Sequence, residues 1–247
     1  MRSANVFEVF SSVQGEGIFV GRRQVFVRFT GCNLACRYCD TAEAREPVAM
    51  AKLEVVPGAR EFKEAENPLA VGELADWIVH LDQTRRHDAV SLTGGEPLLA
   101  AGFIAELIPL CEGRRFHLET NGTLPGELEK VIDLIDVVAM DIKLASSSGE
   151  TTDLGVSREF LSIAVRRSAF VKVVVSDATE SDAVVDAALV AACVNKAIPL
   201  VIQPVTPTDS SLRPPDPRQV LELQMSALRV LSDVRVIPQI HRLTGQK

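Results

Sequence analysis

Three cysteines within eight residues of one another are the strongest chemical feature of the sequence. Cys32, Cys36 and Cys39 form the pattern C-x3-C-x2-C directly after a strand-like run at 24–30. Three thiolates this close can hold three corners of an iron–sulfur cube and leave its fourth iron open to a chelating small molecule. Structural zinc is one alternative, but it needs four closed ligands, and the four histidines are scattered along the chain. The other alternative is three cysteines with no shared role.

Two glycines and two polar motifs accompany the next strand-like runs. Thr93-Gly94-Gly95-Glu96 lies at the end of the run at 88–93, and paired glycines let a ligand approach the backbone closely. Glu119-Thr120-Asn121-Gly122 lies at the end of the run at 116–120, and Asp141-Ile142-Lys143 at the end of the run at 136–142. Taken singly, each motif is also an ordinary turn or helix cap.

The cysteine pattern resembles that of the radical S-adenosylmethionine enzymes, in which an aromatic residue, here Tyr38, precedes the last cysteine. The resemblance implies a 4Fe–4S cluster whose open iron is chelated by S-adenosylmethionine, which one electron then cleaves to a 5′-deoxyadenosyl radical. It implies that Gly94-Gly95-Glu96 binds the methionyl amino group, and that the motifs at 119–122 and 141–143 help to hold the ribose and carboxylate. It assigns Cys32, Cys36 and Cys39 to the cluster, and Tyr38, Cys39, Asp40, Gly94, Gly95, Glu96, Asp141, Ile142 and Lys143 to S-adenosylmethionine.

A third block precedes the cysteines and includes an arginine inside a strand. In the run at 24–30 the odd-numbered positions are apolar and share one face, which places Arg28 on the other face. An arginine inside a barrel needs an anionic partner, and a substrate carboxylate would bind it in bidentate fashion. An exposed or ion-paired arginine is the alternative. Gln14, in the segment 12–17, offers both a donor and an acceptor to the edge of a flat heterocycle; Glu16 could do the same or pair internally.

Taken together, the blocks resemble the 7-carboxy-7-deazaguanine synthase family. Q-G-E-G, the strand arginine, C-N-L-x-C-x-Y-C-D-T, T-G-G-E-P and E-T-N-G occur in that order, and the ending at 236–241 also fits. The resemblance implies a carbon–nitrogen lyase that contracts 6-carboxy-5,6,7,8-tetrahydropterin to 7-carboxy-7-deazaguanine with loss of ammonia, in the biosynthesis of queuosine-type 7-deazapurines. It assigns substrate contacts to Val13, Gln14, Gly15, Arg28 and Thr93, and Mg2+ to Thr41, for which a helix cap is the alternative. It implies no catalytic residue beyond the cofactor ligands.

Alternating strands and helices must position these residues. Strand-like runs occur at 24–30, 88–93, 116–120, 136–142, 170–176, 200–203 and 235–237, and helical periodicity at 71–81, 103–110, 128–135, 181–194 and 216–231. This order predicts an α/β fold, a partial or modified (β/α) barrel of the radical S-adenosylmethionine type with about six βα units. The active site of such a fold lies at the carboxyl ends of the strands. We expect a single domain over 1–247, with an inserted loop at about 42–68 and an extended connection at 205–217.

The composition restricts the partners and the compartment. The 247 residues carry a net charge of −7, which argues against a general nucleic-acid-binding or anionic-membrane surface and leaves only a specific contact with a structured RNA open. No membrane span or signal peptide is visible. The five cysteines are odd in number and unevenly spread, which indicates a reducing cytoplasm and not a set of disulfides. We expect Cys111 and Cys193 in the core. The resemblance suggests a homodimer, and an electron donor such as a flavodoxin. Two other functions stay open: a glycyl-radical-enzyme activating protein, and a zinc- or cluster-stabilised binding module.

Overall fold

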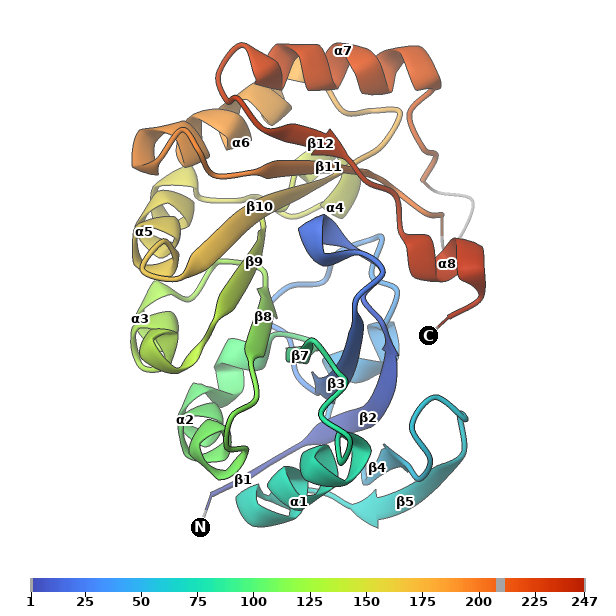
Figure 1. The fold of residues 1–247 in the computed structure, drawn as a ribbon. Coiled ribbons are helices and arrows are strands. Elements are labelled where there is room, and N and C mark those ends of the chain that lie inside the picture. Colours follow the sequence, from blue (N-terminus) through green and yellow to red (C-terminus); the bar gives the residue numbers. More distant parts are fainter. Residues whose placement is uncertain (1, 208–211, 247) are drawn as a thin grey trace.

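One curved sheet of ten strands forms the centre of the computed structural model, which describes residues 2–207 and 212–246 (Figure 1). Its main strands are β2 (Val6–Val13), β3 (Arg23–Phe29), β7 (Ala89–Gly94), β8 (Phe116–Thr120), β9 (Val137–Asp141), β10 (Ser168–Val175), β11 (Leu200–Pro204) and β12 (Val234–Val236). The strands from β3 to β12 are parallel in the order β3-β7-β8-β9-β10-β11-β12, and β2 is antiparallel to β3. Because the sheet curves but does not close, it is a partial barrel.

Six helices connect successive parallel strands and cover the outer face of the sheet (Figure 1). They are α1 (Val71–Leu81), α2 (Ala101–Leu110), α3 (Pro125–Glu129), α5 (Leu154–Ala164), α6 (Ser181–Val194) and α7 (Pro217–Leu228). Helix α1 contacts α2, and α3, α5, α6 and α7 contact one another in succession. The predicted fold class, with about six βα units, is therefore confirmed.

The main core lies between the helices and the sheet, and local sequence explains its parts. Helix α1 buries Val71, Leu74, Ile78 and Leu81, the stripe that its period of 3.6 residues predicts. On β3, the apolar odd-numbered residues join this core, while Arg28 faces the concave side. Strand alternation therefore turns the predicted functional side chain away from the core and into the barrel.

The segment at 42–68 is not the loop that we predicted. It contains a 3-10 turn, η2 (Ala42–Arg45), and two strands, β4 (Met50–Glu54) and β5 (Phe62–Glu66), which extend the sheet beyond β2. A short strand, β6 (Leu69–Ala70), then pairs with β1 (Ser3–Ala4). The signal for β4 was an alternation of only four residues, in which Ala51 and Leu53 are buried and Met50 and Lys52 are exposed.

Several further expectations need correction. The helix predicted at 128–135 is split into α3 and a 3-10 turn, η4 (Ile132–Leu134), since Val131, at a φ of −127°, leaves the helical region between them. Strand β2, helix α5 and the short helices α4 (Ala145–Ser148) and α8 (Ile240–Thr244) were not predicted. Cys111 is buried as expected, but Cys193 is exposed on the outer face of α6. Residues 208–211 of the expected extended connection lie outside the described residues.

Within residues 2–207 and 212–246, no helix has the length and apolar character that crossing a membrane requires.

Candidate active site

A cavity of about 200 Å³ lies on the concave side of the sheet, bordered by the carboxyl ends of the parallel strands. It brings together nearly all of the residues that the sequence motifs predicted. The lining includes Val13, Gln14, Gly15, Arg28, Cys32, Cys36, Tyr38, Cys39, Asp40, Thr41, Thr93, Gly94, Gly95, Asp141 and Lys143. Glu96 and Ile142 are the two predicted residues that do not line it. The side chain of Ile142 belongs to the main core instead.

The cysteine loop presents three free thiols to this cavity. Cys32, Cys36 and Cys39 form no disulfide, and the Cys39 N–H donates to the Cys36 carbonyl at 3.2 Å, which closes a turn between them. Burial raises the pKa of the Cys36 thiol to about 11 and also raises that of Cys32. Because burial disfavours bare thiolates at Cys32 and Cys36, these sulfurs suit a cationic iron centre that compensates their charge.

Glu96 connects two strand ends instead of facing a ligand. Its buried carboxylate accepts hydrogen bonds from the Leu98 N–H at 3.0 Å, the Thr120 hydroxyl at 2.8 Å and the Asn121 N–H at 2.8 Å. Burial raises the pKa of Glu96, although these hydrogen bonds oppose the increase. The residue therefore joins the end of β7 to the end of β8, and positions the Gly94-Gly95 segment between them.

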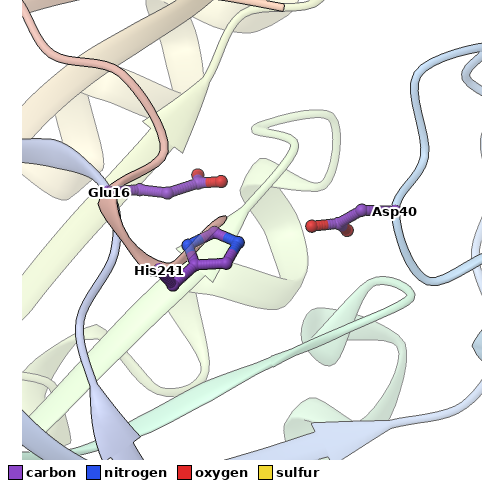
Figure 2. A group of neighbouring side chains, drawn as sticks. All are labelled: Glu16, Asp40 and His241. Carbon is purple, nitrogen blue, oxygen red and sulfur yellow. The ribbon is translucent and has the colours of Figure 1, made fainter. Parts of the chain in front are cut away.

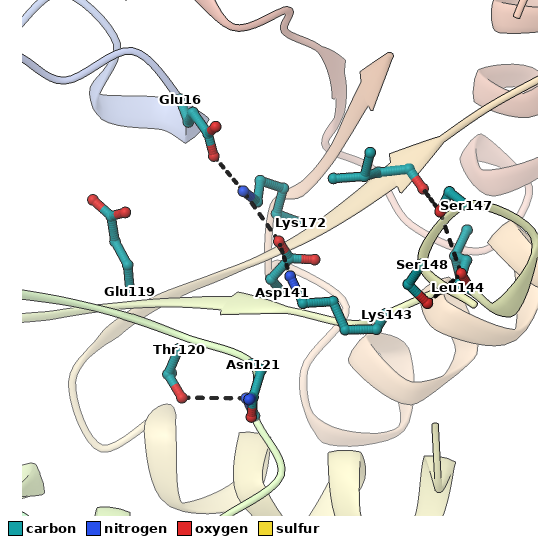
Figure 3. Close-up of polar contacts among 12 residues, drawn as sticks. Glu16, Glu119, Thr120, Asn121, Asp141, Lys143, Leu144, Ser147, Ser148 and Lys172 are labelled. Carbon is teal, nitrogen blue, oxygen red and sulfur yellow. Dashed lines mark hydrogen bonds and ion pairs between the residues drawn. The ribbon is translucent and has the colours of Figure 1, made fainter. Parts of the chain in front are cut away.

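Four charged groups alternate in sign along one wall of the cavity, as Figure 3 shows. Glu16 pairs with Lys172, Lys172 with Asp141 at 3.1 Å, and Asp141 with Lys143 at 2.9 Å. Burial would raise the pKa of Glu16, but Lys172 and a hydrogen bond from Gln239 outweigh it and lower the pKa to about 2. For Lys172 and Lys143, burial opposes the charged form, yet the neighbouring carboxylates raise both pKa values, so both ammonium groups keep their protons.

Glu119 accepts hydrogen bonds from two of the residues predicted to contact substrate, Gln14 and Thr93, and from Ser91, which was not predicted. Its carboxylate accepts hydrogen bonds from Gln14 Nε2 at 2.7 Å, from the Ser91 hydroxyl at 2.7 Å and from the Thr93 hydroxyl at 3.1 Å. The sequence resemblance placed Glu119 beside S-adenosylmethionine. The structure places it among the residues assigned to the substrate.

Arg28 faces the cavity but already has a protein partner. Its Nε donates to Glu8 Oε1 at 2.9 Å, and its guanidinium lies 5.8 Å from the centre of the Phe10 ring. Glu8 stands directly opposite Arg28 in the β2–β3 register. Arg28 is therefore ion-paired, which was the alternative interpretation of this residue. It also lines the cavity.

A group of potential metal ligands lies beside Thr41. Ligand atoms of Glu16, Asp40 and His241 lie within 4.8 Å of one another, and Asp40 approaches the other two from the opposite side (Figure 2). The Thr41 hydroxyl donates to Asp40 Oδ1 at 3.5 Å. Thr41 stands at the N-terminus of η2 but makes no side-chain capping bond there, so the structure does not support the capping interpretation.

Four buried side-chain atoms in the described part of the chain lack a hydrogen-bond partner, and all four belong to residues that line the cavity. They are Tyr38 OH, His117 Nε2, Asp141 Oδ1 and Gln203 Oε1. Buried polar atoms are normally paired, so this concentration fits a cavity built for polar ligands. The motifs missed His117, Lys172 and Gln203, and the ending at 236–241 included His241 without giving it a role. The rule that sites gather at strand ends could have found Gln203, which lies near the end of the predicted strand at 200–203.

The comparisons with known proteins agree with this geometry. The Radical SAM superfamily model matches residues 26–162, which makes the chain a radical S-adenosylmethionine protein and implies a 4Fe–4S cluster with S-adenosylmethionine. The chain is 45% identical to the 7-carboxy-7-deazaguanine synthase of Geobacter sulfurreducens over 98% of both chains. It is 38% identical to that of Methanothermobacter thermautotrophicus, over 98% of this chain and 97% of the relative. The chain belongs to the 7-carboxy-7-deazaguanine synthase family.

Solved structures support the fold. The crystal structure of QueE from Escherichia coli matches with a TM-score of 0.61 at 19% identity, covering 97% of this chain and 95% of that one. Streptococcus suis SuiB bound to S-adenosylmethionine matches with a TM-score of 0.56 at 14% identity, over 85% of this chain and 48% of that one. At these identities the likeness concerns the architecture alone.

Proposed function

We propose that this enzyme contracts the ring of 6-carboxy-5,6,7,8-tetrahydropterin to 7-carboxy-7-deazaguanine with loss of ammonia, in the biosynthesis of queuosine-type 7-deazapurines. The observation that carries the proposal is one cavity in which three free cysteines share the lining with Gln14, Thr93 and Arg28. The synthases among the curated relatives favour this reaction over the activation of a glycyl-radical enzyme.

The cofactors fit the residues present. Cys32, Cys36 and Cys39 would hold the 4Fe–4S cluster, and the unpartnered Asp141 Oδ1 and Tyr38 OH provide polar atoms for S-adenosylmethionine. When bound, the cluster and S-adenosylmethionine supply the radical that starts the rearrangement. Glu96 and Ile142 would act only through their backbone, since their side chains lie outside the cavity lining.

The chain's own residues bind and orient the substrate. Arg28 provides a guanidinium for the pterin carboxylate, and Gln14, Thr93 and Glu119 form a connected polar group for the ring edge. Val13 and Gly15 form an adjoining part of the cavity wall. The rings of Phe10, Phe26 and Phe170 also line the cavity and exclude water from the substrate. Lys143 and Lys172 contribute positive charge but no proton acceptor, because their raised pKa values keep them protonated.

Magnesium is the third proposed cofactor. We assign Mg2+ to Thr41, with the neighbouring carboxylates of Glu16 and Asp40 as further oxygen ligands. Mg2+ prefers oxygen ligands and keeps several waters, so a few protein oxygens with substrate oxygens would complete its octahedron. We also propose that the chain folds as one domain, works in the cytoplasm as a homodimer and receives its electron from a flavodoxin-like donor.

The test is an anaerobic incubation of the reconstituted protein with dithionite, S-adenosylmethionine, Mg2+ and the carboxypterin. We expect 7-carboxy-7-deazaguanine by mass spectrometry, with absorbance near 400 nm and about four irons per chain. The Cys36→Ala variant is the control and should lack both the cluster and the product. A protein with an intact cluster and no product would overturn the proposed reaction.

A further inference from the structure

A buried histidine that belongs to none of the motifs lines the cavity. His117 lies on β8 and is 1% exposed, and its Nε2 has no hydrogen-bond partner among the described residues. The rings of Phe19 and Phe170 lie 5.5 and 6.1 Å from its own ring. The imidazole is therefore held in place by packing, with one nitrogen unpaired.

A series of hydrogen bonds that starts at a backbone N–H determines which nitrogen of this imidazole carries the proton. The Glu16 N–H can only donate, and it meets Gln14 Oε1 at 3.0 Å, which fixes the orientation of the Gln14 amide. Gln14 Nε2 is then the end that donates to Glu119 Oε1 at 2.7 Å and to Gln24 Oε1 at 3.2 Å.

The orientation of the Gln24 amide then determines which nitrogen of His117 accepts a hydrogen bond. Because Gln24 Oε1 accepts from Gln14, it is Gln24 Nε2 that faces His117 Nδ1 at 3.4 Å. An amide nitrogen donates, so Nδ1 must be the acceptor and carry no proton. Burial lowers the pKa of His117 and keeps the ring neutral. The single ring proton is therefore on Nε2, the nitrogen without a partner.

We propose that His117 is a specificity-determining residue whose Nε2–H donates a hydrogen bond to an acceptor on the heterocyclic ring of the substrate. This inference rests on the proposed function and specifies where the protein offers a hydrogen-bond donor and where it offers an acceptor to the ring. His117 offers a donor, and Glu119, two residues further along the same face of β8, offers an acceptor. That pair fits a ring edge on which a carbonyl or ring nitrogen stands near an N–H or amino group. A ring with a hydrogen-bond donor opposite His117 would place two donors face to face at the buried Nε2–H, and the site would reject it.

Two substitutions separate the nitrogen atoms of His117. His117→Gln keeps a donor at the distance of Nε2, whereas His117→Asn keeps an acceptor near the place of Nδ1, opposite Gln24, and lacks the distant donor. The measurement is the Kd of the reconstituted holoenzyme for 7-carboxy-7-deazaguanine, by anaerobic titration, together with KM and kcat for the carboxypterin. Iron content and thermal unfolding check that each variant keeps its cluster and fold.

We expect His117→Asn to weaken binding about tenfold and to raise KM with little change in kcat, and His117→Gln to stay within about threefold of the wild type. Equal affinities for the two variants, or a loss confined to kcat, would overturn the donor role of His117. If the wild type binds and converts no pterin, the proposed function fails instead. The two failures are therefore distinct.

Discussion

Gly95 lies so close to Gly31 that a β-carbon at position 95 would stand 1.9 Å from the Gly31 carbonyl oxygen. The same carbonyl accepts a hydrogen bond from the Glu96 N–H at 2.7 Å. Gly31 immediately precedes Cys32, so the glycine motif at the end of β7 is packed directly against the start of the cysteine loop. The paired glycines therefore position the cluster ligands by close backbone contact, in addition to any contact that they make with S-adenosylmethionine.

Gly95→Ala should consequently reduce cluster binding. The added methyl group would push the Gly31 backbone away and displace Cys32, since backbone cannot yield as a flexible side chain can. We expect less than half of the wild-type iron after reconstitution, measured by iron analysis and absorbance near 400 nm. Gly72→Ala is the matched control, because a β-carbon there meets nothing within 4 Å. Full iron content in Gly95→Ala would show that the contact does not position the cluster loop.

The partly buried ion pair of Glu16 and Lys172 should make the stability of the protein depend on pH. The pKa of Glu16 is lowered from 4.5 to about 2 in the folded protein. The pair therefore stabilises the fold fully above pH 4.5, and this contribution is lost as the pH falls from 4.5 towards 2. Between pH 6 and pH 4 the loss amounts to about 1 kcal/mol.

Urea unfolding of the cluster-free protein at pH 6 and pH 4 measures this difference without interference from the acid lability of the cluster. In Glu16→Gln the change in unfolding free energy between the two pH values should be about 1 kcal/mol smaller than in the wild type. Glu222→Gln removes an exposed carboxylate that pairs with Arg218, and it should behave like the wild type. An unchanged pH dependence in Glu16→Gln would contradict the lowered pKa.

The sequence predicted those parts of the site whose placement follows from chain order alone. Cys32, Gly95 and Asp141 each lie at or just after the end of a recognisable strand, and parallel strands bring their carboxyl ends to one edge. Strand alternation likewise predicted that Arg28 turns away from the core. These inferences need only the two-residue alternation of side chains in a strand and the order of the strands along the chain.

The partners of these residues could not be predicted, because they depend on register and on contacts between distant segments. Glu8 stands opposite Arg28 only through the pairing of β2 with β3, and β2 itself was not predicted. Lys172 reaches Glu16 across 156 positions of sequence. The role of His117 depends on the direction of three successive hydrogen bonds, which no pattern of residue types specifies.

Removal of the Thr41 hydroxyl should weaken the response to magnesium. We expect Thr41→Ala to need about tenfold more Mg2+ for half-maximal rate, which corresponds to about 1.4 kcal/mol of lost metal binding, while Thr41→Ser stays close to the wild type. The measurement is the initial rate against Mg2+ concentration after treatment with EDTA, with iron content as the control for cluster loss. If Thr41→Ala shows the wild-type dependence on Mg2+, the metal does not bind at this hydroxyl.

Substitution of Arg28 should separate its two contacts. Arg28→Ala removes both the proposed substrate carboxylate contact and the guanidinium that pairs with buried Glu8, so KM should rise at least tenfold and the Tm should fall. Arg28→Lys keeps the charge beside Glu8 but loses the bidentate geometry, so KM should rise with little change in Tm. Arg22→Ala, which removes an exposed pairing with Asp88, is the control and should leave KM unchanged. Loss of iron from Arg28→Ala, with KM unaltered in Arg28→Lys, would show that the arginine supports the fold and not the substrate.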